Sequence, residues 1–309
     1  MAHLKVKFDT TIAEHFDSFL LCCKGKGLSP KTLQTYQQHF HSISKHLDIS
    51  IPTESLRKAD LDSMISSMRD SGLASNSIRS YTRTMKSFLS WCNQEQITLL
   101  NIPLYKAEET IKETYTDSEL KALLKKPDLR TCRFSEYRNW VIINLLINNG
   151  CRAATIRNIL VKDVDLDSRV IYLRHTKNKK SQVLPICNSL SMILKEYLRI
   201  RNGGDSDYLF PNESNEQLSE YGLRCTIVRY NHSRGVLRTS IHAFRHTFAR
   251  KYLVDCGGNA FTLQRLLGHS TLDMTKHYCA IFDADIVKNF DAFSPLEQLN
   301  AKKKSLSVR

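Results

Sequence analysis

Apolar side chains recur at helical spacing through most of the first hundred residues, and this periodicity restricts that part of the chain to helices. Ser29 and Pro30 favour the start of the second helix, because serine can cap a helix and proline tolerates its first position. The third apolar stripe ends near Gly72, and Ser75 is predicted to cap a fourth helix. Residues 1–104 are therefore predicted to form a small bundle of four short helices.

A second domain is predicted to follow a short linker. Residues 105–115 are rich in charge and follow a proline-broken stretch, which is typical of a connection between domains. Thr116 and Glu119 have the spacing of a capping box, in which each side chain satisfies an N–H group at the start of a helix. We expect the second domain to cover residues 116–290, with a basic tail at 291–309.

The second domain is predicted to combine helices with one β-hairpin. The apolar run 140–147 indicates a buried helix that ends at Gly150. Residues 169–175 alternate in the manner of a strand and can pair with 181–186, which leaves 176–180 at the tip. The expected fold class is mainly α with a small antiparallel β-sheet or hairpin.

The charge balance favours a polyanionic partner. The formal net charge is +14, of which +3 falls on residues 1–105 and +11 on residues 106–309. A surplus of this size favours nucleic acid, and the second part is the stronger candidate for binding phosphates. Charge alone leaves open the alternative of a basic protein with no such partner.

The cysteines indicate a reducing environment. There are nine, and none forms a C-x-x-C pair or a zinc-ligand spacing, which is typical of free thiols in a cytoplasmic protein. The N-terminus lacks a signal-peptide core, and the longest apolar run is too short to span a membrane. We expect a cytoplasmic location without membrane contact.

Three aspartates offer an alternative to be weighed. Asp163, Asp165 and Asp167 alternate and could suggest a metal site, but a turn before the hairpin is the better interpretation. We therefore expect neither a metal ion nor another cofactor.

Several basic residues of the second domain could act on a phosphate. Arg152 follows the buried helix, although a structural ion pair is an equal alternative for an arginine at the edge of a core. His242 and Arg245 lie three residues apart at a predicted helix start, which places both on one face. By itself this spacing is common by chance and favours an ordinary surface helix.

A histidine and a tyrosine follow near the end of the domain. His269 stands in the break Leu267-Gly268-His269-Ser270, where Gly268 suits a left-handed turn and Ser270 could cap the next helix. Tyr278 comes nine residues later. A lone tyrosine on an amphipathic helix more often packs in a core than takes part in catalysis.

Taken in chain order, these signals become specific. With a lysine in the hairpin they resemble the motif set of the tyrosine recombinases, also called the phage integrase family: Arg152, Lys177, His242, Arg245, His269 and Tyr278. Pro185, eight residues after Lys177, also suits the family's lysine-bearing hairpin. The resemblance covers roughly residues 8–290. One departure is Thr155, because the family usually has an acidic residue there that supports the active site.

The resemblance implies a helical core-binding domain followed by a mixed α/β catalytic domain. It implies that Tyr278 attacks the DNA phosphate and forms a 3′-phosphotyrosyl bond, while Arg152 and Arg245 stabilise the phosphate charge. Lys177 would protonate the departing 5′ oxygen. His242 would transfer a proton near Tyr278, and His269 would donate to the phosphate.

The implied partners are double-stranded DNA with inverted-repeat core sites and three further copies of the chain. The apolar series from Ile286 to Leu299 would join protomers in a tetramer, with packing on the chain's own core as the alternative. The expected role is integration or excision of a mobile element, favoured by Thr155, or resolution of a replicon. Two rival functions are relaxation of DNA by a type IB topoisomerase-like enzyme and DNA binding by a protein with a decayed site.

Overall fold

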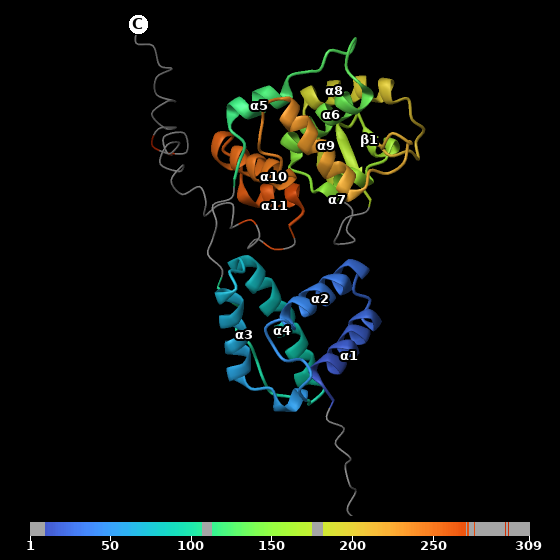
Figure 1. The fold of residues 1–309 in the computed structure, drawn as a ribbon. Helices are drawn as coiled ribbons and strands as arrows, with labels where there is room; N and C mark the ends of the chain where they lie inside the picture. The colour runs from blue at the N-terminus through green and yellow to red at the C-terminus, as the bar shows by residue number, and fades with distance from the viewer. Residues whose placement is uncertain are drawn as a thin grey trace, which may run out of the picture. The chain divides into compact units, whose positions relative to one another are not determined.

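The chain divides into two compact units, residues 1–110 and residues 111–309, in a computed structural model (Figure 1). The structure describes residues 10–106, 113–174 and 182–269, together with residues 271, 275, 294 and 296. The predicted fold class is confirmed, because the described part is mainly helical and contains one small antiparallel sheet. No described helix is long and apolar enough to cross a membrane.

The first unit is a bundle of four helices, as the periodicity predicts. Its elements are α1 (Ile12–Gly25), α2 (Pro30–Ile43), the 3-10 turn η1 (Thr53–Ser55), α3 (Lys58–Asp70) and α4 (Ser75–Gln94). Ser29 caps α2 by accepting a hydrogen bond from the Thr32 N–H. The prediction for Ser75 is wrong, because the carbonyl of Ala74 already opens α4 and makes Ser75 its first helical residue.

Contacts between aromatic rings join three helices of this bundle. The rings of Phe16 on α1 and Phe40 on α2 stack with centroids 3.7 Å apart, and Phe88 on α4 meets Phe16 edge-on at 5.4 Å. Phe16 and Phe88 are buried, so α1, α2 and α4 share one apolar core. Burial of such rings supplies much of the stabilisation available to a unit this small.

The second unit packs its helices around α6. Its elements are α5 (Asp117–Leu124), α6 (Phe134–Asn149), α7 (Ala153–Asn158), the 3-10 turn η2 (Val161–Asp163), β1 (Val164–Asp165), β2 (Val170–Leu173), β3 (Gln182–Pro185), α8 (Asn188–Arg201), α9 (Glu220–Ser233), α10 (Ile241–Arg250), the π-helical turn η3 (Lys251–Asp255) and α11 (Ala260–Leu267). Helix α6 is buried along most of its length and contacts α5, α8, α9 and α10. The capping box of Thr116 and Glu119 at the start of α5 is confirmed.

The sheet is antiparallel in the order β1-β2-β3. Strands β2 and β3 pair, as the alternation predicts, and their register is Ile171↔Leu184, with both of these side chains facing the core. A turn at residues 166–169 precedes β2, as the aspartate run predicts, and Val164 and Asp165 before it pair with β2 as a third strand. The predicted hairpin tip, 176–180, lies outside the described residues.

Candidate active site

Arg152 is placed by the way α6 ends. Gly150 closes the helix in the left-handed conformation, at a φ of 59°. A Cβ atom there would lie 2.7 Å from the Phe248 ring, so both backbone and space require glycine. The chain then turns through the buried Cys151, and Arg152 is the residue immediately before α7.

Arg152 has no structural ion pair in the described part of the chain, where no carboxylate lies within 4.0 Å of it. Its Nη1 and Nη2 atoms each lie 3.4 Å from the carbonyl oxygen of Gly268. These are long contacts, and a neutral carbonyl leaves the charge uncompensated. Cys151 beside it is no rival nucleophile, because burial raises the pKa of its thiol to about 12 and keeps it neutral.

Arg245 is a core residue rather than part of an ordinary surface helix, with 4% of its surface exposed. It lies on α10, which packs against α6. Its Nη1 donates to the carbonyl of Gly150 at 2.9 Å, and its Nη2 donates to the carbonyl of Leu267 at 2.8 Å. The guanidinium therefore joins the end of α6 to the end of α11.

His269 follows directly from the end of α11. Gly268 ends that helix in the left-handed conformation, at a φ of 61°, as the sequence predicts. The Nε2 atom of His269 lies 2.8 Å from Nη2 of Arg245, and its Nδ1 atom lies 2.8 Å from Oγ1 of Thr275. A guanidinium can only donate, so Nε2 accepts. The neutral imidazole then carries its proton on Nδ1 and donates it to Thr275.

Of the other three predicted residues, the structure describes His242. His242 is exposed in the first turn of α10, one turn before the buried Arg245. Ser240 caps that turn by accepting from the N–H of Ala243. Lys177 and Tyr278 lie outside the described residues, as do the residues of the apolar series after Tyr278 except Leu296, which is exposed. The structure thus brings together Arg152, Arg245 and His269.

Sequence reasoning missed two residues of this site. Thr275 is completely buried and holds the Nδ1 side of His269. Gln182, the first residue of β3, donates from Nε2 to the carbonyls of Arg265 and Leu266, at 3.0 and 2.8 Å. No local pattern marks either residue, and the partners of Gln182 lie 83 and 84 residues away in sequence.

Thr155, at the position that is usually acidic in the family, and the aspartates at 163, 165 and 167 are structural residues in the described part of the chain. Thr155 lies half-buried in α7, and its side chain makes no hydrogen bond to another described residue. Asp163 is buried, and its carboxylate accepts from Nε of Arg174 at 2.8 Å and from the N–H of Leu160. Across the described ranges, no three His, Cys, Asp or Glu side chains gather as metal ligands would.

Tyr252 is the next tyrosine after α10, and its ring has a packing role. A Cβ added to Gly258 would lie 2.2 Å from that ring, and the Phe248 ring lies 5.9 Å away. The ring is half-buried beside a small apolar cluster that includes Leu263 and Leu267. This placement supports the turn η3 and does not favour Tyr252 as a nucleophile.

The comparisons with known proteins decide the family. Residues 113–284 match the phage integrase family, and residues 14–96 match the phage integrase N-terminal SAM-like domain. The chain belongs to the phage integrase family. It is therefore a tyrosine recombinase, an enzyme that recombines DNA, as the motif order predicts.

Curated relatives match this tyrosine recombinase over nearly its whole length. The tyrosine recombinase XerC of Thermodesulfovibrio yellowstonii is 25% identical, with 88% of this chain and 93% of the relative covered. The tyrosine recombinase XerA of Pyrococcus furiosus is also 25% identical, with 94% of this chain and 97% of the relative covered.

Solved structures share the fold. The Tn1549 transposon integrase in complex with a circular intermediate DNA gives a TM-score of 0.72 at 20% identity, over 87% of this chain and 94% of that one. A lambda integrase tetramer bound to a Holliday junction gives 0.70 at 18% identity, over 88% of this chain and 78% of that one.

Proposed function

We propose that this recombinase cuts DNA at a phosphate held by Arg152, Arg245 and His269, with Tyr278 as the nucleophile. The observation that carries this proposal is the convergence of the three described residues on the end of α11. Two guanidinium groups can stabilise the non-bridging oxygens of a phosphate through forked, permanently charged donors. This arrangement supplies by side chains the charge that many phosphoryl-transfer enzymes obtain from metal ions.

The proposed reaction has two balanced steps. The Oη atom of Tyr278 attacks phosphorus, a P–O bond to tyrosine forms, and the P–O5′ bond breaks. The tyrosine proton passes to His242, and Lys177 protonates the departing 5′ oxygen. In the reverse step a 5′ hydroxyl of a partner strand attacks the phosphotyrosine, so the bond energy is retained and rejoining needs no ATP.

Binding a phosphate requires His269 to change its hydrogen bonding. In the structure its Nε2 accepts from Arg245, and an accepting nitrogen cannot donate to a phosphate oxygen. A phosphate between the two side chains would replace this contact and accept from both. His269 must then carry a proton on Nε2, while Nδ1 keeps its bond to Thr275.

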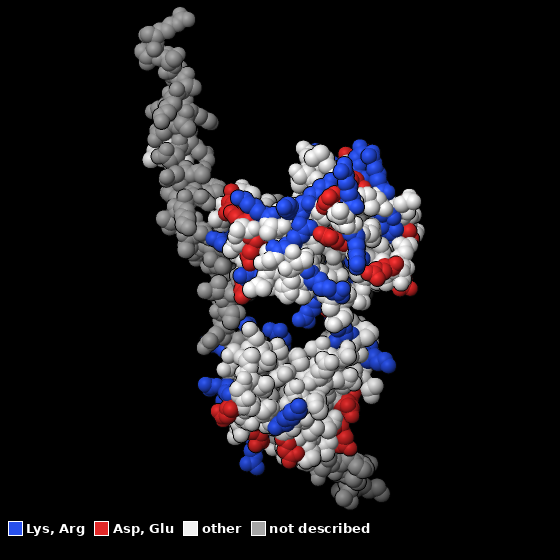
Figure 2. Space-filling view, turned by 45° about the horizontal axis from the view of Figure 1, so that its top comes forward, with Lys and Arg blue, Asp and Glu red and all other residues white. Residues whose placement is uncertain are grey.

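The proposed partner is double-stranded DNA with inverted-repeat core sites, bound by four copies of the chain. Lys and Arg side chains spread across much of the visible face of the second unit (Figure 2). Such a surface neutralises backbone phosphates without reading sequence. The segment from Ile286 to Leu299 would join neighbouring protomers through its apolar series.

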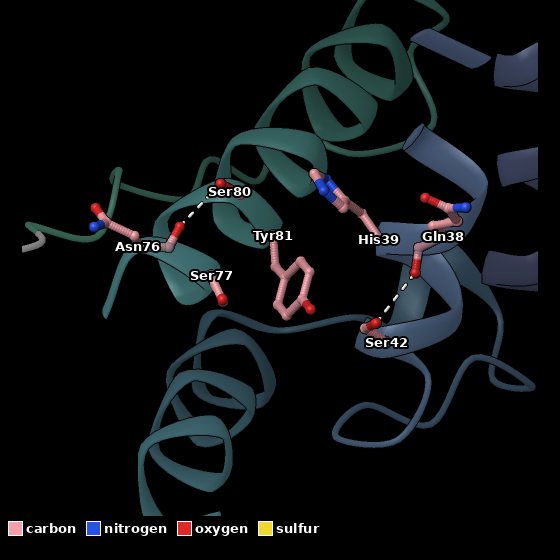
Figure 3. Close-up of a pocket in the computed structure, with 7 residues that line it drawn as sticks. All are labelled: Gln38, His39, Ser42, Asn76, Ser77, Ser80 and Tyr81. Atoms are coloured by element: carbon pink, nitrogen blue, oxygen red, sulfur yellow. Dashed lines mark hydrogen bonds between the residues drawn. The ribbon is translucent and has the colours of Figure 1, made fainter. Parts of the chain in front are cut away.

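The first unit offers a groove suited to reading bases. It has a volume of about 450 Å³, lies between α2 and α4, and is lined by uncharged polar residues (Figure 3): Gln38, His39, Ser42, Asn76, Ser77, Ser80 and Tyr81. Burial lowers the pKa of His39, whose Nδ1 contacts Thr84 at 2.7 Å, so its imidazole is neutral near pH 7. Asn and Gln amides can pair with base edges, and this groove is the proposed source of sequence preference.

The test of the nucleophile is the substitution Tyr278→Phe, which removes one hydroxyl. The wild type should form a covalent adduct with a nicked suicide substrate, in excess EDTA, through the 3′ phosphate. The variant should bind the same DNA normally and form no adduct. Peptide mass spectrometry should locate the nucleotide on Tyr278. An adduct in the variant, or cleavage that requires added Mg²⁺, would refute the proposal.

A further inference from the structure

The end of α11 is held by side chains from three other segments. The carbonyls of Arg265 and Leu266 accept hydrogen bonds from Gln182. The carbonyl of Leu267 accepts from Arg245, and the carbonyl of Gly268 lies against Arg152. A helix leaves its last four carbonyls without partners within the helix. Here four consecutive carbonyls, at 265–268, each face a side-chain donor.

Gln182 differs from the other two donors. Arg152 and Arg245 are proposed to bind the phosphate, whereas Gln182 is neutral and belongs to β3, which pairs with β2 at Leu173↔Gln182. Its carboxamide therefore links the sheet to the end of α11 without adding charge. From this geometry we infer that Gln182 is a positioning residue for the proposed reaction, an inference that rests on the proposed function.

The contact with Gly268 is close as well as polar. A Cβ atom on Gly268 would lie 2.6 Å from Oε1 of Gln182, so the carboxamide lies directly against this glycine. His269 is the next residue, and its main-chain N–H also bonds back to the helix, at Gln264. Gln182 therefore fixes the backbone one residue before the imidazole that is proposed to bind phosphate.

Loss of Gln182 should displace His269. The carbonyls of Arg265 and Leu266 would lose their side-chain donor, so the backbone that leads from α11 into His269 would lose one of its restraints. An imidazole that shifts with this backbone is withdrawn from the phosphate. The expected consequence is slower cleavage with little change in DNA affinity, because backbone phosphates elsewhere supply most of the binding.

The experiment compares three variants by single-turnover cleavage of a suicide substrate. Gln182→Met keeps the length of the side chain and removes both N–H donors, and we expect cleavage to slow about 10- to 100-fold, the scale of a 1 Å misplacement. Gln182→Glu places a carboxylate against carbonyls and should be slower still. Val183→Thr, at the exposed neighbouring position of β3, is the matched control and should cleave normally.

A double-mutant cycle separates positioning from mere stability. If Gln182 acts through the end of α11, then Gln182→Met should cost much less in a His269→Ala background than in the wild type. Melting temperatures of all variants, measured in parallel, show whether each is folded. Gln182→Asn, which withdraws the carboxamide by one methylene, serves as a second variant if Gln182→Met does not fold.

The outcomes are distinguishable. Wild-type cleavage by Gln182→Met or by Gln182→Asn, together with a defect in Arg245→Ala, would overturn this inference and leave the proposed function intact. Equal losses with and without His269 would assign Gln182 a merely structural role and also overturn it. An adduct in Tyr278→Phe would instead refute the proposed function, whatever the Gln182 variants do.

Discussion

The substitution Arg245→Lys tests whether the buried guanidinium both supports the fold and serves the reaction. Its two terminal nitrogens reach three acceptors: the carbonyls of Gly150 and Leu267, at 2.9 and 2.8 Å, and Nε2 of His269 at 2.8 Å. A lysine has a single nitrogen and a shorter reach, so it keeps the positive charge but cannot satisfy both carbonyls.

The magnitude follows from these contacts. A buried carbonyl left without its donor costs about 1–3 kcal/mol. For a unit the size of residues 111–309, each kcal/mol lowers the melting temperature by about 2–4 °C. Cleavage should fall further, by about 100- to 1000-fold, because loss of one preorganised donor to a transition state costs about 2.7–4 kcal/mol.

The assay measures thermal melting, DNA affinity and single-turnover cleavage on one preparation. The matched control is Arg199→Lys, at an exposed position of α8, which should leave all three unchanged. Wild-type cleavage by Arg245→Lys would refute the proposed role of Arg245 at the phosphate. Full recovery of cleavage at a temperature well below melting would show that the arginine only supports the fold.

Three further predictions follow from the proposed site and groove. Lys177→Ala should slow cleavage of normal DNA far more than cleavage of a substrate with a 5′-bridging sulfur, because sulfur leaves without an acid; equal defects would move the general acid to another residue. Deletion of 283–309 should preserve binding to a single site and impair assembly on paired sites in gel-shift experiments; normal pairing would assign the segment to the chain's own core. Replacing Gln38 and Asn76 by Ala should weaken binding to a cognate site by about 1–3 kcal/mol per lost base contact while binding to unrelated DNA stays the same; an equal loss on both DNAs would exclude base reading by this groove.

The arrangement at the end of α11 also explains how two arginines can share one small site. Their donors face main-chain carbonyls rather than carboxylates in the contacts that join them to α6 and α11. Carbonyl dipoles orient a guanidinium without neutralising it. In the proposed phosphate site both side chains would then already be held in place, which lowers the reorganisation needed during the reaction.

Local sequence patterns determined much of the fold. The helical periodicity predicted the four helices of the first unit, and the alternation at 169–175 and 181–186 predicted the β2–β3 pair. Gly150 and Gly268 predicted two helix ends, because helices often end at a residue in the left-handed conformation and glycine adopts it without a steric penalty. These features are encoded within a few residues, so they can be read without the fold.

The family was also readable from the sequence, although no single motif was specific. The order of the motifs predicted the family, since independent weak signals become specific when they occur together and in the expected order along the chain. Local patterns failed at Ser75, where α4 begins one residue earlier than predicted, and at Val164–Asp165, where pairing with β2 forms a third strand.

Only the tertiary structure decided how the site is held. Arg245 bonds to a carbonyl 95 residues away in sequence, and Gln182 bonds to one 83 residues away. Any nearby donor can satisfy a carbonyl at a helix end, so the sequence around Arg265 does not specify which side chain arrives there. That choice depends on how α6, α10, β3 and α11 pack, and the same packing buries Arg245 and places its guanidinium against Nε2 of His269.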